Sequence, residues 1–296
     1  MGDTNISFLD LKALSEPASK LIEAVSSAVG VLYEPTRIRR RAKADADAAL
    51  ILAESEGGER GIALRAAERA NSREIRRQEN IEAVVKGALG YLPESVSGEK
   101  VDEDWVVQFF GYCQDVGDEE MRSLWAKILA GEVTAPNSYS PRTLHTVKLL
   151  RKDDAHLFAR FCGYVWEVGD VAGYIWAGTT DALLASKGLS LKRWIHLQTI
   201  GLVETFGPLQ VHEKAPLVAS YHGRKYVFTL VNSPGTVMDM TSKGENPSYR
   251  NIGIHLLTEV GRELAPLSAA NPDDEYLIAL AESLEFNQVK MTRAEG

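Results

Sequence analysis

Apolar side chains in the middle of the chain recur at the spacing of a helix. The positions on this face are Met121, Leu124, Trp125, Ile128 and Leu129. Asp118 precedes them as a capping residue, with further acids in the first turn, and Gly131 follows as a stop signal. The pattern predicts one amphipathic helix between these two residues.

Two further helix starts follow directly along the chain. Ser140-Pro141 is a capping serine followed by a proline at the first helical position. Asp153-Asp154 places carboxylates ahead of an apolar run, where they satisfy free backbone N–H groups. Together with the preceding helix, these starts predict a central helical domain over residues 99–178.

The N-terminal part is helical in pattern as well. One helix face carries Leu21, Val25, Val29 and Leu32. Residues 44–56 are alanine-rich and favour a helix, and residues 62–89 interleave Arg and Glu at spacings that allow pairing along a helix. Polar residues and a proline at 91–98 end the region, so we expect N-terminal helical arms over residues 1–98.

The C-terminal part mixes helical and strand-like patterns. The expected elements are a turn at Lys187-Gly188, a helix at 190–199, strand-like runs at 202–204, 217–221 and 225–231, and a closing helix at 252–264. On the helix at 190–199, we expect Leu191, Trp194 and Ile195 to face the core. The order of helices, strand, hairpin and closing helix is typical of a winged-helix domain, here residues 179–296. The expected fold class is therefore mainly α, with helical arms, a central helical bundle and a winged-helix-like α+β domain.

Composition places the chain among globular proteins and limits its partners. The net charge is −8, with 15 Lys+Arg against 16 Asp+Glu in residues 1–100 and 18 against 25 in residues 101–296. Nucleic acid would therefore need a local basic patch. The two cysteines, Cys113 and Cys162, are too few for a disulfide framework or a zinc site and indicate free thiols in a reducing cytoplasm.

Two groups of basic residues are candidates for contact with phosphates. The first, a run without an acid, contains Arg37, Arg39, Arg40, Arg41 and Lys43. It fits nucleic acid or anionic lipid, and equally the solvated start of a helix. The second comprises Lys192, Arg193 and His196 on the second helix of the expected winged helix, with Arg224 and Lys225 on its wing. Winged helices also serve in protein contact, and protein contact or a purely structural use is the alternative for this group.

A cluster of ionisable residues in the central domain has local structural explanations. Its members are Glu132, Arg142, His145, Asp153, Asp154 and His156. The aspartates cap a helix, and neither histidine belongs to an HExxH pair. We predict that Glu132 and Arg142 pair with each other and fix the loop between them. No catalytic residue, metal or cofactor is expected.

The most distinctive segment of the chain is SLWAKILAGEVTAPNSYSPRTLHTVKLLRKDDAHLFARFC. It resembles a bacterial family named domain of unknown function 2806. The opening LSEPASKLIEAVSSAVGVLYEPTRIRRRAKADADA and the later LTEVGRELAPLS resemble it too, so the similarity spans about Leu11–Leu280. More distantly, the helical core is similar to abortive-infection alpha-like proteins, which implies a link to bacterial defence against phage.

These observations lead to two hypotheses for function. The first is a non-enzymatic cytoplasmic interaction protein, in phage defence, that forms a homo-oligomer or binds a protein partner through its N-terminal helices. The second is a nucleic-acid-binding regulator that uses the basic run and the winged helix. Peripheral membrane contact by Leu21, Val25 and Val29 is a further possibility; the alternative for this face is packing within a helical bundle.

Overall fold

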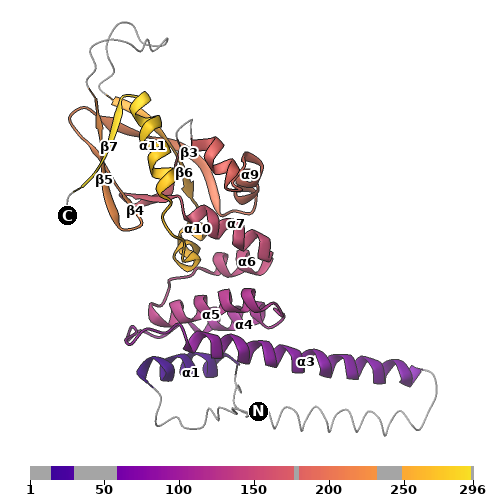
Figure 1. Cartoon of the computed structure of the whole chain (residues 1–296). Coiled ribbons are helices and arrows are strands. Elements are labelled where there is room, and N and C mark those ends of the chain that lie inside the picture. Colours follow the sequence, from indigo (N-terminus) through magenta and orange to yellow (C-terminus); the bar gives the residue numbers. More distant parts are fainter. Residues whose placement is uncertain (1–14, 30–58, 177–179, 232–248, 295–296) are drawn as a thin grey trace, which may run out of the picture. The chain divides into compact units, whose positions relative to one another are not determined.

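A computed structural model of the chain describes residues 15–29, 59–176, 180–231 and 249–294. The chain divides into two compact units, Met1–Lys148 and Leu149–Gly296, called unit 1 and unit 2 below (Figure 1). The division falls inside the stretch that the sequence pattern assigns to one central domain.

The described part of unit 1 is helical. Its helices are α1 (Glu16–Val29), α3 (Glu59–Leu89), α4 (Glu103–Cys113), α5 (Glu119–Thr134) and α6 (Pro141–Leu149). Both α1 and α3 pack against α4 and α5. The expected cap at Asp118 is present, since its carboxylate accepts the N–H of Met121 at 3.0 Å. Asp102 likewise accepts the N–H of Trp105, so both helices begin at an aspartate.

The apolar face of α1 lies inside the bundle. Leu21 and Val25 are fully buried where α1 contacts α4 and α5. These two side chains are therefore not exposed for the membrane contact considered above, while the side chain of Val29 lies outside the described residues. Packing of α1 within a helical bundle explains its apolar stripe.

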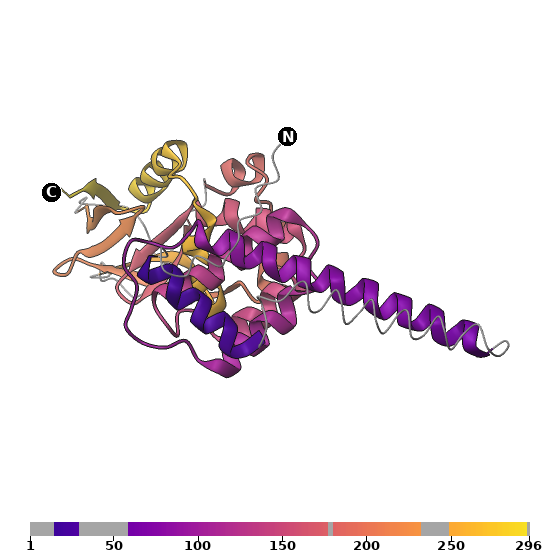
Figure 2. The same ribbon diagram turned by 90° about the horizontal axis from the view of Figure 1, so that it is seen from below.

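Among the residues that the structure describes, the buried side chains of α3 lie in its second half. Ile81, Val84, Val85 and Ala88 are buried there. A Cβ added at Gly87 would lie 3.0 Å from the Cβ of Ala126, so α3 and α5 approach closely at this glycine. The first half projects beyond α1, α4 and α5 (Figure 2), and Ile62 near its start is 64% exposed. At 31 residues the helix is about 46 Å long.

A buried carboxylate holds the loop between α5 and α6. Glu132, 1% exposed, accepts the N–H of Asn137 at 2.6 Å and that of Tyr139 at 3.0 Å. The carbonyl of Tyr139 accepts the indole N–H of Trp105 at 2.6 Å. The Tyr139 ring lies against Gly131, where an added Cβ would be 2.7 Å from the ring. Three hydrogen bonds thus hold the loop to α4 and α5, and two of them are buried.

Glu132 does not pair with Arg142 as the sequence pattern predicts. Arg142 is exposed near the start of α6, and its guanidinium forms no ion pair with any described residue. The prediction that Glu132 fixes the loop is right, but the bonds come from backbone N–H groups. Sequence spacing favours charged partners and gives no sign of such backbone donors.

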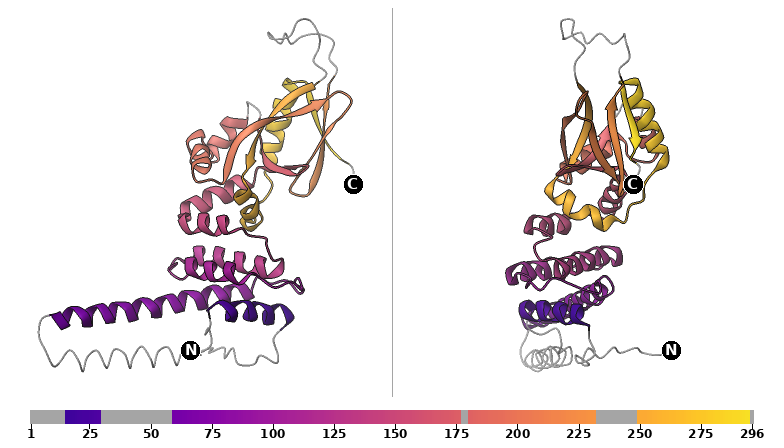
Figure 3. Two further views of the ribbon diagram at one scale, coloured as in Figure 1. Left: turned by 180° about the vertical axis from the view of Figure 1, so that it is seen from behind. Right: turned by 90° about the vertical axis from the view of Figure 1, so that its left-hand side faces the viewer.

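Unit 2 is built around a sheet. Its elements are α7 (Lys152–Cys162), β1 (Val165–Val168), β2 (Val171–Trp176), α8 (Thr180–Ser186), α9 (Leu191–Thr199), β3 (Val203–His212), β4 (Leu217–Tyr221), β5 (Arg224–Leu230), β6 (Tyr249–Leu257), α10 (Glu259–Leu264), the 3-10 helix η2 (Ala265–Ser268), α11 (Asp274–Phe286) and β7 (Val289–Arg293). The seven strands form one antiparallel sheet in the order β3-β6-β2-β1-β4-β5-β7. Strand β3 also approaches β5, although four strands lie between them in this order, so the sheet is strongly curved (Figure 3).

Aromatic side chains fill the core of unit 2. Trp166, Tyr221, Phe228 and Tyr276 are fully buried. The indole N–H of Trp166 donates to the hydroxyl of Tyr276 at 2.9 Å, and this hydroxyl donates to the carbonyl of Ile175 at 2.9 Å. Tyr276 therefore joins α11 to β1 and β2, and its hydroxyl both accepts and donates a hydrogen bond.

The expected fold class is wrong because unit 2 contains this large sheet. A winged helix would pair the strand after its second helix with the following hairpin. Instead β3 pairs with β6, and two strands, β2 and β1, separate β6 from the hairpin β4–β5 along the sheet order. The expected closing helix at 252–264 is β6 followed by α10. Ile252 and Ile254 are buried there with the two-residue period of a strand. In so short an apolar run, the sequence pattern does not distinguish a strand from a helix.

The buried carboxylate predicts a stability effect. Replacing Glu132 by Ala leaves the N–H groups of Asn137 and Tyr139 without their acceptor, and we expect the free energy of unfolding to fall by about 2–3 kcal/mol. Arg142→Ala, at an exposed side chain without an ion pair, should change it by less than about 0.5 kcal/mol. Urea denaturation followed by circular dichroism measures both, and a larger loss for Arg142→Ala would contradict the geometry.

Candidate functional site

A pocket lies between the α8–α9 helix pair and the sheet of unit 2. The turn between the helices is set by Gly188, which has φ +83°, a conformation that favours glycine. The N–H of Leu189 donates to the carbonyl of Leu184 at 2.7 Å, which closes the end of α8. Leu184, Leu189 and Leu197 are buried and anchor the two helices. The turn predicted at Lys187-Gly188 is confirmed.

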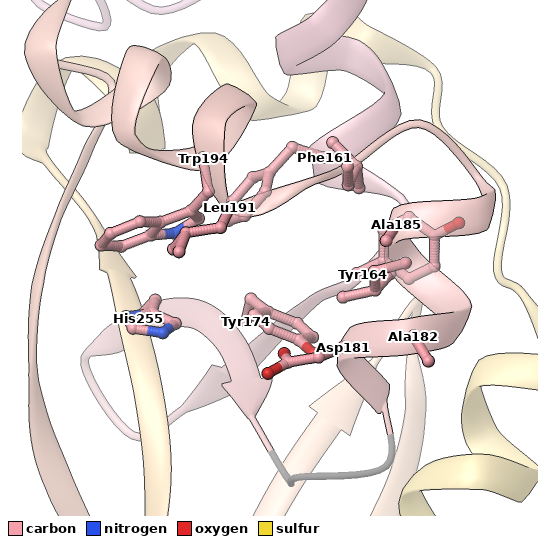
Figure 4. A pocket seen from close by; sticks show the side chains of 11 residues that line it. Phe161, Tyr164, Tyr174, Asp181, Ala182, Ala185, Leu191, Trp194 and His255 are labelled. Carbon is pink, nitrogen blue, oxygen red and sulfur yellow. The ribbon is translucent and has the colours of Figure 1, made fainter.

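Aromatic and aliphatic side chains dominate the walls of this pocket, which has a volume of about 550 Å³. The residues that line it are Phe161, Tyr164, Tyr174, Asp181, Ala182, Leu184, Ala185, Leu189, Leu191, Trp194 and His255 (Figure 4). Pockets of this size and composition take small organic molecules. The pocket is the candidate functional site.

The register of two strands forms one wall of the pocket. Tyr174 of β2 is paired with His255 of β6, and their rings stack with centroids 6.2 Å apart and planes 16° apart. The hydroxyl of Tyr174 lies 2.6 Å from the hydroxyl of Thr180, the first residue of α8. The same tyrosine thus positions the start of α8 against the sheet.

Trp194 of α9 lies opposite this wall. Its ring centroid is 4.4 Å from that of His255, and Figure 4 shows Trp194 and Leu191 facing Tyr174 across the pocket. The indole N–H of Trp194 is buried and has no hydrogen-bond partner among the described residues. A ligand oxygen or a water molecule would satisfy this donor.

The ionisable groups of the pocket are mostly neutral at pH 7. Burial raises the pKa of Tyr164 to about 12 and also raises the pKa of Tyr174. Burial lowers the pKa of His255, and the nearby carboxylate of Asp181 offsets this only in part. Among the described lining residues Asp181 is the one acid, and no lysine or arginine occurs.

The two cysteine thiols are buried. Burial raises the pKa of both thiols, that of Cys162 to about 12, which makes them poor nucleophiles. Among the residues that the structure describes, no group of three or more His, Cys, Asp or Glu side chains is placed to hold a metal ion.

The structure distributes the predicted phosphate contacts over separate places. Lys192 and Arg193 are exposed on α9, and Lys225 is exposed on β5. Arg224 lies 3.7 Å from the carboxylate of Asp274. Figure 1 places α9 and the β4–β5 hairpin on different sides of unit 2. The basic run of Arg37, Arg39, Arg40, Arg41 and Lys43 lies outside the described residues.

His196 has a structural partner. Its Nε2 lies 2.7 Å from a carboxylate oxygen of Asp154 at the start of α7, and this carboxylate also accepts the N–H of Arg151. Burial alone would raise the pKa of Asp154, but the bonds from His196 and Arg151 outweigh it and lower the pKa. His196 therefore links α9 to α7, and its Nε2 is not available to bind a phosphate.

The sequence does not reveal the pocket residues. The pattern assigns Leu191 and Trp194 to a core and predicts no binding role for Tyr174, Asp181 or His255. The local signal was weak because Tyr174 and His255 meet only through the β2–β6 pairing, between segments far apart in the chain. A tryptophan at helical spacing fits a core and a pocket wall equally well.

The lowered pKa of His255 predicts a pH dependence of stability. The unfolded chain takes up a proton on this residue near pH 6.5, whereas the folded protein does so only at lower pH. Stability should therefore fall as pH drops below about 6.5. His255→Phe keeps a ring but cannot take up a proton, so its free energy of unfolding should decrease less between pH 7.5 and pH 5. Urea denaturation at these two pH values measures the difference. An identical pH dependence in both proteins would show that the pKa is not lowered.

Comparison with known proteins identifies one family. The model of the family "Protein of unknown function (DUF2806)" matches residues 64–281, more than two thirds of the chain. No curated protein and no solved structure matches the sequence, and the comparisons do not show the expected similarity to abortive-infection proteins. The resemblance in the segment around the α5–α6 loop is confirmed, and the chain belongs to the DUF2806 family.

Proposed function

We propose that the protein is a non-enzymatic interaction protein whose unit 2 binds a small, largely apolar molecule. The observation that carries this proposal is the pocket of about 550 Å³ between α8–α9 and the sheet, walled by Phe161, Tyr164, Tyr174 and Trp194. Sites for small molecules are concave and apolar, with a few polar groups that orient the ligand. Here Asp181 and the indole N–H of Trp194 are such groups.

The N-terminal helices are the proposed contact for a protein partner or a second copy of the chain. The first half of α3 extends beyond the described helices α1, α4 and α5, and it carries half-buried Leu64, Ala67, Asn71 and Ile75 at spacings of three and four residues. Such a stripe is the usual contact surface between helices. Two free buried cysteines favour a reducing compartment such as the cytoplasm. Among the described helices, none is both long and apolar enough to cross a membrane.

Filling the pocket should abolish binding of a small neutral probe. We expect 2-phenylethanol to bind with a Kd on the order of 1 mM, typical of so small a ligand. Ala185→Trp places an indole in the pocket and should raise the Kd at least about tenfold. Ser186→Trp, the same change at the next, exposed residue of α8, should leave it nearly unchanged. Ligand-observed NMR titrations measure both, and equal binding to the Ala185→Trp variant would overturn the proposal.

A nucleic-acid-binding role is the second candidate, and the exposed Lys192 and Arg193 favour it. If α9 contacts phosphates, replacing both by Ala should weaken binding to duplex DNA and reduce the dependence of affinity on salt by about two counterions. The exposed pair Lys290 and Arg293 on β7 provides the control with the same change in charge. Fluorescence anisotropy at 50 and 200 mM salt measures the effect, and no binding at the lower salt would remove this candidate.

A further inference from the structure

Charge selects among the molecules that would fit the aromatic pocket of unit 2. We infer that the pocket binds a small organic cation, an amine or quaternary ammonium ion with an apolar body, whose charge lies between the aromatic rings and the carboxylate of Asp181. The inference rests on the proposed ligand-binding function and adds the chemical class of the ligand. It follows from the rings, the charge of the walls and the access to the pocket.

The rings supply the first argument. Phe161, Tyr174 and Trp194 lie on facing sides of the pocket, and the Phe161 and Tyr174 rings have centroids 6.3 Å apart in an edge-to-face arrangement (Figure 4). The face of an aromatic ring carries partial negative charge and attracts a cation within about 6 Å. An anion has no such attraction to these walls. Rings from α7, β2 and α9 thus surround a common space from three directions.

The charge of the walls gives the second argument. Asp181 is the one acid among the described lining residues, and neither lysine nor arginine lies there to neutralise an anionic ligand. His255 does not add a positive charge at neutral pH, because its burial disfavours the protonated form. A cation therefore gains both from the rings and from the carboxylate, whereas an anion is repelled by Asp181.

Access and position support the same ligand. Leu191 lines the pocket and is 72% exposed, so a side chain of the wall reaches solvent and a ligand has a route inward. Asp181 is exposed in the first turn of α8, and Figure 4 shows it beside the Tyr174 ring. A ligand with an apolar body inside the pocket can thus keep its charged head near Asp181 and partly hydrated. This arrangement avoids the high free energy of burying a charge completely.

The test compares three probes of one shape and different charge. At pH 7.5, 2-phenylethylamine is a cation, 2-phenylethanol is neutral and phenylacetate is an anion. Calorimetric titration of the full chain should give the amine a Kd about tenfold below that of the alcohol, with the anion weakest. Asp181→Asn keeps the shape of the side chain and should reduce the preference for the amine to about threefold or less, with binding of the alcohol unchanged.

Two variants control for charge and folding. Asp181→Glu keeps the carboxylate and should retain the preference for the amine over the alcohol. If Asp181 only stabilised the start of α8, this preference would not depend on the carboxylate. Asp170→Asn removes an exposed acid of the same unit outside the pocket and should retain this preference too.

Equal affinity for amine and alcohol would overturn the inference and leave the proposed binding function standing. If no probe binds, the proposed function fails as well; if Asp181→Asn also loses the alcohol, the charge preference is refuted.

Discussion

The arrangement of unit 2 depends on the pairing of β2 with β6. This pairing brings Tyr174 beside His255 and so forms one wall of the pocket. It also requires glycine at position 173, because a Cβ there would overlap the backbone carbonyl of His255. The strands meet only when the chain between them has folded back across the sheet, so the pocket wall is a product of long-range pairing. Shifting one of these strands by one residue would turn its ring to the opposite face of the sheet and separate it from the other ring.

Strand β2 is also held by a tyrosine of α11. Tyr276 of α11 accepts from the indole of Trp166 and donates to the carbonyl of Ile175, next to Tyr174 in β2. Burial raises the pKa of Tyr276, which keeps the hydroxyl protonated and able to donate. Unit 1 uses the same principle with Glu132, whose carboxylate binds two backbone N–H groups of a loop. In both units a buried polar side chain holds a segment of backbone in place: Glu132 holds a loop, and Tyr276 holds a strand of the curved sheet. Each stabilises the fold because its hydrogen bonds are satisfied.

Local signals in the sequence predicted what is local in the structure. The cap at Asp118, the stripe of α5 and the turn at Gly188 each depend on neighbouring residues, and each is present. The sheet escaped prediction because β6 must be paired with β2 and β3 before its alternation can be told from a helix. Glu132 accepts hydrogen bonds from backbone N–H groups, and the spacing of charged residues in the sequence does not indicate such donors. The pocket residues could not be predicted for the same reason as β6. The walls of the pocket come from segments that are far apart in the sequence and meet only in the folded chain.

The two sides of the pocket differ in how tightly they are packed, and this difference affects which ligand charge the pocket selects. Tyr174 is buried in the sheet, and its hydroxyl is bonded to Thr180, so a change there disturbs β2, β6 and α8 together. Asp181 is exposed at the start of α8, outside the hydrophobic core. A substitution at Asp181 therefore alters the charge presented to a ligand while most of the stabilising contacts remain. The sheet determines the shape of the pocket, and the exposed residues of α8 determine which charge it accepts.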